Sequence, residues 1–224
     1  MLIQIVTVDR SKRPAADLEA LAARLRARGH DVVIWRFTAA DVYAGHSAGL
    51  DEVIEAIWTS DRACFQHARQ QNAPYTLLLE DDCELTDLDG IDVAESFLRT
   101  HDGPVDLFFL GTSPNCWWSG TWDPRIVKYS HAYWWHAVVF TASFIERYEG
   151  PRTWKGGNDI QMARLMASGE IAAYGLRRQV AFQCDRRNRF AERVLYRWPW
   201  GDGRWLAAAA LLGVFAWIGF RTSR

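Results

Sequence analysis

Apolar and polar residues repeat along the first part of the chain with two periods, that of a strand and that of a helix. Residues 2–8 (LIQIVTV) are rich in β-branched residues and predict a buried strand. Residues 15–30 place three leucines on one helical face, with Pro14 before them and Gly29 near the end, which predicts a helix. Residues 31–37 (DVVIWRF) predict a second strand. A strand, a helix and a strand in this succession form a βαβ unit, so we expect a parallel sheet.

The same two periods continue to about residue 185. Helical spacing and apolar runs predict helices at 50–71, 92–100 and 158–170, strands at 74–80, 105–111 and 171–176, and a strand that runs into a helix at 136–148. Residues 112–136 are crowded with tryptophans and predict a loop-rich region. We therefore expect an α/β domain at 1–185, in which helices flank a mostly parallel sheet, and an extension at 186–224.

The extension contains the uncharged run 205–220 (WLAAAALLGVFAWIGF), which predicts a hydrophobic C-terminal helix between Arg204 and Arg221. At ~1.5 Å per residue this helix would be roughly 24 Å long, which is less than the ~30 Å hydrocarbon core of a membrane. Trp205 and Trp217 stand near its ends, as is typical of the membrane boundary. The run predicts a short or interfacial membrane anchor, and a helix packed on protein is an equally weighted alternative.

Composition narrows the class of protein. The formal net charge of −1 provides no basic excess to neutralise phosphates, which argues against nucleic-acid binding. The four cysteines are scattered without a C-x-x-C pair and predict reduced thiols in a cytosol-like compartment. Residues 1–8 lack the basic start of a signal peptide. We expect a cytoplasmic protein that is peripheral to, or anchored at, a membrane through residues 205–220.

Three carboxylates, Glu80, Asp81 and Asp82, follow directly after the apolar run of the strand at 74–80. Ligands of open α/β sheets bind beyond the carboxyl ends of the strands, where these acids are expected. In an extended segment Glu80 and Asp82 would share one face while Asp81 points away. Carboxylates in this spacing suit a hard divalent cation, Mg²⁺ or Mn²⁺, which would also relieve their repulsion. A solvated acidic turn is the alternative.

Several blocks of the sequence resemble, in order, the motifs of one enzyme family. They are TVDRSKRP at 7–14, LLLEDDCEL at 77–85, DLFFLG at 106–111, HAY at 131–133 (with HAVVFTASF from His136 fitting almost as well) and NDIQMARLMASGEIAAYGL at 158–176. In these blocks the chain resembles the family 25 glycosyltransferases, which have the GT-A fold and act in lipopolysaccharide and collagen glycosylation. That family usually has a Ser-His pair shortly before the acids, where this chain has Ser60 and Asp61.

The resemblance implies an enzyme that moves a sugar, with galactose suggested, from a nucleotide diphosphate donor, with a UDP-sugar suggested, to a glycan acceptor hydroxyl with inversion. A divalent cation would stabilise the leaving diphosphate, and a carboxylate would remove the acceptor proton. The implied roles are Glu80 and Asp82 for the metal, Thr7, Asp9, Arg10, Ser11 and Asp81 for the nucleotide-sugar, and Asp159 as the catalytic base.

Two alternatives stay open. The same acids would serve another metal-dependent nucleotide or phosphate enzyme, and the missing His beside Ser60 is compatible with an inactive family member that acts as a scaffold. His131 and His136 do not share a helical face, so core or surface positions are expected for them in preference to metal binding. The tryptophans of residues 112–136 are expected in the core or on a partner surface more often than in stacking on sugar rings.

Overall fold

The computed structural model describes residues 1–8, 14–37, 50–112, 116–133, 135–149 and 158–183. The helices in these ranges are α1 (Ala15–Arg26), α3 (Leu50–Gln70), α4 (Asp89–Thr100), α5 (Ala142–Tyr148) and α6 (Asn158–Ser168). The strands are β1 (Leu2–Val8), β2 (Asp31–Phe37), β3 (Tyr75–Glu80), β4 (Cys83–Leu85), β5 (Leu107–Phe109), β6 (Trp117–Gly120), β7 (Ile126–His131), β8 (Ala137–Thr141), β9 (Ala173–Leu176) and β10 (Ala181–Gln183).

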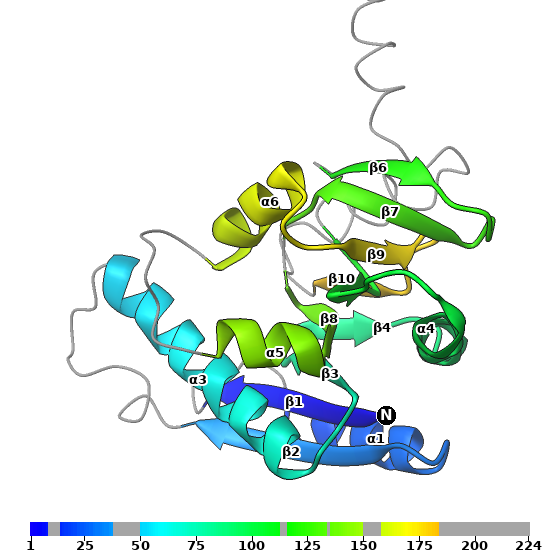
Figure 1. Cartoon of the computed structure of the whole chain (residues 1–224). Helices are drawn as coiled ribbons and strands as arrows, with labels where there is room; N and C mark the ends of the chain where they lie inside the picture. Colours follow the sequence, from blue (N-terminus) through cyan, green and yellow to red (C-terminus); the bar gives the residue numbers. More distant parts are fainter. Residues whose placement is uncertain (9–13, 38–49, 113–115, 134, 150–157, 184–224) are drawn as a thin grey trace, which may run out of the picture.

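Eight of these strands form one sheet in the order β2-β1-β3-β8-β5-β9-β7-β6, and β10 pairs with β4 in a small second sheet (Figure 1). The βαβ unit expected at the start of the chain is confirmed, because β1 and β2 are parallel and paired from Leu2 and Asp31 to Val8 and Phe37. Strand β3 joins the other side of β1, also in parallel. The α/β class predicted from the sequence is therefore correct.

The sheet is mixed, which corrects the expectation of a mostly parallel one. Among the described strands, β8 runs antiparallel to both β3 and β5, and β7 runs antiparallel to both β9 and β6. Only the pairs β1–β2, β1–β3 and β5–β9 are parallel. The sequence of β8, AVVFT, is buried at every position. A strand that is buried on both faces has no alternation of polar and apolar residues, so its sequence does not indicate whether it pairs in parallel or antiparallel.

Helices cover both faces of the sheet, and each face has its own apolar core. Helices α1 and α4 pack on one face, and α3, α5 and α6 pack on the other (Figure 1). Successive residues of β3 serve the two cores alternately, since Leu77 and Leu79 point to the first and Leu78 points to the second. This arrangement explains the uninterrupted run of leucines, and it fixes the end of β3 firmly in the middle of the molecule.

Part of the region expected to be loop-rich forms the hairpin of β6 and β7. Strand β6 lies at the edge of the sheet, and its register shifts between Trp117 and Trp118. This irregularity, together with the exposure of three of its four residues, removes the period-2 pattern that would have predicted a strand. The predicted extension at 186–224, with its apolar run 205–220, lies outside the described residues. No helix in the described part of the chain has the length and apolar character needed to cross a membrane.

Candidate functional site

The candidate site lies where the carboxyl ends of β1 and β3 meet the start of β8. Glu80, the last residue of β3, is paired with Val6 of β1. The backbone N–H of Glu80 donates to the carbonyl of His136 at 3.0 Å, so the residue before β8 lies beside it. This is the edge at which open α/β sheets bind ligands.

The strand ends at Glu80, and Asp81 and Asp82 lie in a turn before β4. The extended geometry expected for residues 80–82, with Glu80 and Asp82 on one face, is therefore not formed. The Thr7 hydroxyl donates to Asp81 Oδ2 at 2.8 Å, and the Gln183 amide donates to Asp82 Oδ2 at 2.8 Å. The two aspartates are thus fixed by different strands, β1 and β10.

Glu80 interacts electrostatically with the other carboxylates of the site. Burial raises the pKa of its carboxyl to about 8, and negatively charged neighbours contribute to this shift. Those neighbours, in order of decreasing effect, are Asp82, Asp61, Asp81 and Asp159. The predicted acids at 80–82 and the predicted Asp159 are therefore close enough to interact electrostatically, and Asp61 joins them. A carboxyl in such surroundings keeps a proton at neutral pH unless a cation approaches it.

Asp61 is a site residue that the sequence analysis did not select. It lies on α3, it is 6% exposed, and burial raises its pKa to about 7. The side-chain amide of Asn158, at the start of α6, donates to Asp61 Oδ2 at 3.0 Å and opposes that rise. A signal was present in the sequence, since Asp61 stands three residues after Trp58 and four before Phe65, on the same apolar helical face.

Asp159, the expected base, is half-buried on the first turn of α6. Its Oδ1 accepts a 2.8 Å hydrogen bond from the backbone N–H of Ile160, and its negative charge contributes to the raised pKa of Glu80. Acidic side chains are favoured at the positive end of a helix. The position of Asp159 is thus compatible with helix stabilisation as well as with a chemical role.

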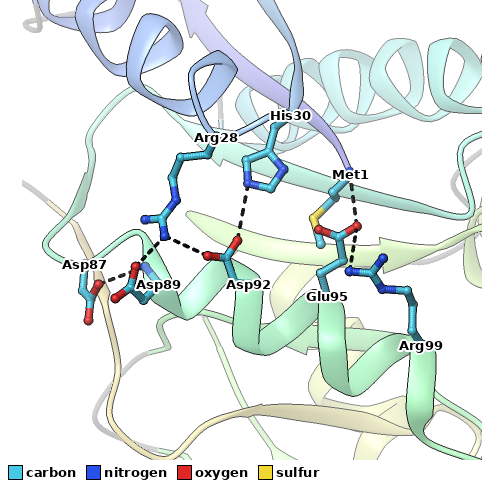
Figure 2. A network of polar contacts seen from close by, with 8 residues as sticks. All are labelled: Met1, Arg28, His30, Asp87, Asp89, Asp92, Glu95 and Arg99. Atoms are coloured by element: carbon cyan, nitrogen blue, oxygen red, sulfur yellow. Dashed lines mark hydrogen bonds and ion pairs between the residues drawn. The ribbon is translucent and has the colours of Figure 1, made fainter.

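A second group of acids, on α4, shows how the chain neutralises carboxylates elsewhere (Figure 2). Arg28 Nη2 lies 2.5 Å from Asp89 Oδ1 and 2.8 Å from Asp92 Oδ2. Glu95 lies 3.6 Å from Arg99 and 3.5 Å from the amino group of Met1. The acids of α4 are therefore surrounded by positively charged groups.

The carboxylates at the end of β3 differ from those of α4. Within the described ranges, no lysine, arginine or histidine forms an ion pair with Glu80, Asp61 or Asp159. Their repulsion is relieved by hydrogen bonds and by protonation, as the raised pKa values of Glu80 and Asp61 indicate. Among the described residues, Glu80, Asp61 and Asp159 thus have oxygen acceptors without a paired positive charge, which is the electrostatic character that suits a cation or a ligand rich in hydroxyl donors.

The histidines of this region occupy core and intermediate positions, which is the outcome favoured from the sequence. His136 is 1% exposed, and burial lowers its pKa to about 4, so it is neutral at physiological pH. Its Nε2 lies 3.4 Å from the carbonyl of Ala181 and joins the start of β8 to β10. His131 is half-buried and packs edge-on against Tyr133.

The tryptophans of residues 112–136 divide between surface and core. Trp117 and Trp122 are 69% and 74% exposed, whereas Trp135 is buried among the residues that pack on α3 and α5. Trp118 is half-buried, and the guanidinium of Arg177 lies 5.3 Å from its ring. The exposed pair keeps both interpretations of this region open, a partner surface and a sugar-stacking surface.

Three of the residues expected at the nucleotide-sugar, Asp9, Arg10 and Ser11, lie outside the described residues. No group of three or more Asp, Glu, His or Cys side chains in the described ranges is arranged to hold a metal ion. Magnesium in nucleotide enzymes is commonly held by one or two carboxylates together with substrate phosphates and water. Glu80 and Asp82 supply carboxylate oxygens of that kind, so the donor chemistry fits the expected cation.

No protein-family model matches the chain, and no curated protein matches it. Among solved structures, A197 from STIV is similar with a TM-score of 0.45 and 11% identity, over 80% of this chain and 82% of that chain. A glycosyltransferase involved in the glycosylation of the major capsid of PBCV-1 is similar with a TM-score of 0.37 and 13% identity, over 66% of this chain and 63% of that chain. Both TM-scores are below 0.5, so neither similarity carries a conclusion about activity.

Proposed function

We propose that the protein is a glycosyltransferase that moves a sugar from a nucleotide diphosphate to a glycan acceptor hydroxyl with the help of a divalent cation. The observation that carries the proposal is the group of carboxylates around Glu80. They stand at the ligand-binding edge of an α/β sheet, and no described arginine or lysine pairs with Glu80, Asp61 or Asp159.

The proposed cation would be held by Asp82 and Glu80, and it would supply positive charge to the diphosphate as this leaves the sugar. The pKa of Glu80, raised to about 8, means that its carboxyl exchanges a proton for a cation at little cost near neutral pH. Asp82 is held in place by Gln183 through a single oxygen, and Asp81 is held by Thr7. The two aspartates are thus preorganised before a ligand arrives.

Asp159 is the proposed base for the acceptor hydroxyl. It stands on a separate element from the proposed cation ligands, at the start of α6. The proposed donor is a UDP-sugar such as UDP-galactose, as the resemblance of the sequence blocks suggests. We propose that its nucleotide contacts Thr7 and Asp81, together with Asp9, Arg10 and Ser11, which lie outside the described residues.

The runner-up is another metal-dependent nucleotide or phosphate enzyme, because it would use the same carboxylates. Incubation with Mn²⁺ and a panel of nucleotide-sugars separates the two, since sugar transfer releases a nucleoside diphosphate, whereas attack on the diphosphate of the same donors releases a sugar 1-phosphate. The scaffold alternative predicts that Mn²⁺ with UDP-galactose leaves the melting temperature unchanged. We expect release of the diphosphate and a higher melting temperature; release of a sugar 1-phosphate or an unchanged melting temperature would reject the proposal.

A further inference from the structure

The first turn of α6 is attached to α3 by one buried hydrogen bond. Asn158 Nδ2 donates to Asp61 Oδ2 at 3.0 Å, across 97 positions of the chain. The two residues are 7% and 6% exposed. The loss of one partner of such a buried hydrogen bond leaves the other buried and unsatisfied.

The same pair lies at the carboxylate site. Asp61 and Asp159 both act on Glu80 electrostatically, so α3 and the start of α6 converge on the end of β3. Asn158 adds a further feature, because its Oδ1 is buried and has no hydrogen-bond partner among the described residues. An amide oxygen without a partner beside a group of carboxylates is ready to accept a hydrogen bond from a ligand.

We propose that Asp61 is a positioning residue, which holds the amide of Asn158 and thereby fixes the first turn of α6, with Asp159, against the carboxylate site. Asn158 Oδ1 is then presented to an O–H donor, either a sugar hydroxyl or a water bound to the cation. This inference rests on the proposed function for the identity of the ligand, and on the geometry alone for the link between α3 and α6.

Two substitutions of Asp61 separate its hydrogen bond from its charge. Asp61→Asn keeps an oxygen that can accept from Asn158, whereas Asp61→Leu removes it at similar size. Thr76→Val is the matched control for general destabilisation. It removes a buried 3.0 Å side-chain hydrogen bond, donated by Gln4, near the opposite end of β3.

The experiment measures hydrogen exchange of the peptide 158–166 and the affinity for Mn²⁺ alone and for Mn²⁺ with UDP-galactose. We expect Asp61→Leu to speed exchange of this peptide by roughly tenfold or more and to weaken binding of Mn²⁺ with UDP-galactose by about tenfold. Asp61→Asn and Thr76→Val should stay within about threefold of the wild type. A loss with Mn²⁺ alone identifies metal-bound water as the donor, and a loss only with UDP-galactose identifies a sugar hydroxyl.

Each contrary result has a distinct meaning. Unchanged exchange of residues 158–166 in Asp61→Leu overturns the inference, whatever ligand the protein binds. Faster exchange with affinity equal to that of Thr76→Val shows a structural role only and also overturns it. A loss of affinity in Asp61→Asn as large as in Asp61→Leu means that the charge of Asp61 acts directly, which rejects the positioning role. A wild type that binds neither Mn²⁺ nor UDP-galactose refutes the proposed function, while the exchange measurement still tests the link to α6.

Discussion

The hydroxyl of Thr7 donates a 2.8 Å hydrogen bond to Asp81 and so joins the end of β1 to the turn after β3. Thr7 is 5% exposed, and its strand is paired with β3 in parallel register. The contact links two sequence blocks that are 74 positions apart. Both blocks were assigned to the nucleotide-sugar site from the sequence, and the tertiary structure places them side by side.

Replacement of Thr7 by valine should cost about 1–2 kcal/mol in the free energy of unfolding, because a hydrogen bond to a carboxylate is lost while the size is kept. Urea denaturation measures this cost. Thr100→Val is the control, since Thr100 makes an exposed 2.9 Å bond to the carbonyl of Ser96 and its removal should change stability by less than ~0.5 kcal/mol. Equal effects of the two variants would contradict a specific role for the Thr7–Asp81 contact.

Glu80→Gln should alter the dependence of stability on pH. The pKa of Glu80 is raised from 4.5 to about 8, so the folded state binds a proton more tightly than the unfolded state between these values. Wild-type stability therefore falls as pH rises through this window, and the amide abolishes that contribution. We expect the variant to be more stable than the wild type by ~1–3 kcal/mol at pH 9 and similar to it below pH ~5.

Urea unfolding at several pH values tests this prediction, with the exposed Glu146→Gln as control. Mn²⁺ should raise the melting temperature of the wild type at pH 8 and have little effect on Glu80→Gln, because a bound cation replaces the proton. If the free energy of unfolding depends on pH in the same way for wild type and Glu80→Gln, the pKa of the Glu80 carboxyl is not raised in the folded protein.

Asp82→Asn should lower Mn²⁺-dependent turnover of UDP-galactose by roughly 100-fold or more, because an amide replaces a charged ligand oxygen. The fold should persist, since the asparagine oxygen can still accept from Gln183. Asp82→Ala, by contrast, removes a contact between the turn and β10 and is expected to cost about 1 kcal/mol. Asp92→Asn, in the arginine-neutralised group on α4, is the matched control and should leave turnover unchanged. Full activity of Asp82→Asn would exclude this aspartate from the cation site.

Gly111→Ala should destabilise the protein by more than ~2 kcal/mol. A Cβ at this position would lie 2.1 Å from the carbonyl oxygen of Ala181 and 2.9 Å from His136 Nε2. The backbone after β5 therefore has to approach β10 more closely than a side chain permits. Gly29→Ala is the comparison, because nothing lies within 4 Å of its Cβ and only the strain of its φ of +83° remains, worth ~1–2 kcal/mol. The midpoints of chemical denaturation of the two variants show whether Gly111→Ala is the more destabilising.

The elements that the sequence predicted best are those with one clear period. The helix expected at 50–71 is α3 (Leu50–Gln70), and the strands expected at 2–8 and 31–37 have the same bounds in the structure. Strand β7 was missed although it has six residues and lies inside the sheet, and the other missed strands, β4, β6 and β10, have only three or four residues. Three or four residues offer too few positions for a period to be read.

From local sequence pattern alone, the candidate site was predicted only where its residues are neighbours in the chain, and Thr7 and Asp159 came from the family resemblance. Glu80, Asp81 and Asp82 form a visible cluster after an apolar strand, but Asp61 and Asn158 come from two distant helices. Each is ordinary in its own segment, one as an acid within a helix and the other as a polar residue at the start of a helix. Their importance depends on the 3.0 Å contact between them, and no local pattern encodes it.

By itself the sequence determined the class of the fold, the βαβ start and the acidic end of β3, because side-chain periodicity directly reports which faces are buried. Tertiary structure alone decided the direction of β8, the turn in which Asp81 meets β1 and Asp82 meets β10, and the contact between Asp61 and Asn158. Those features depend on which buried surfaces pack together in the folded chain. Apolar faces look alike in sequence, so the pattern of apolar residues does not show which face packs against which.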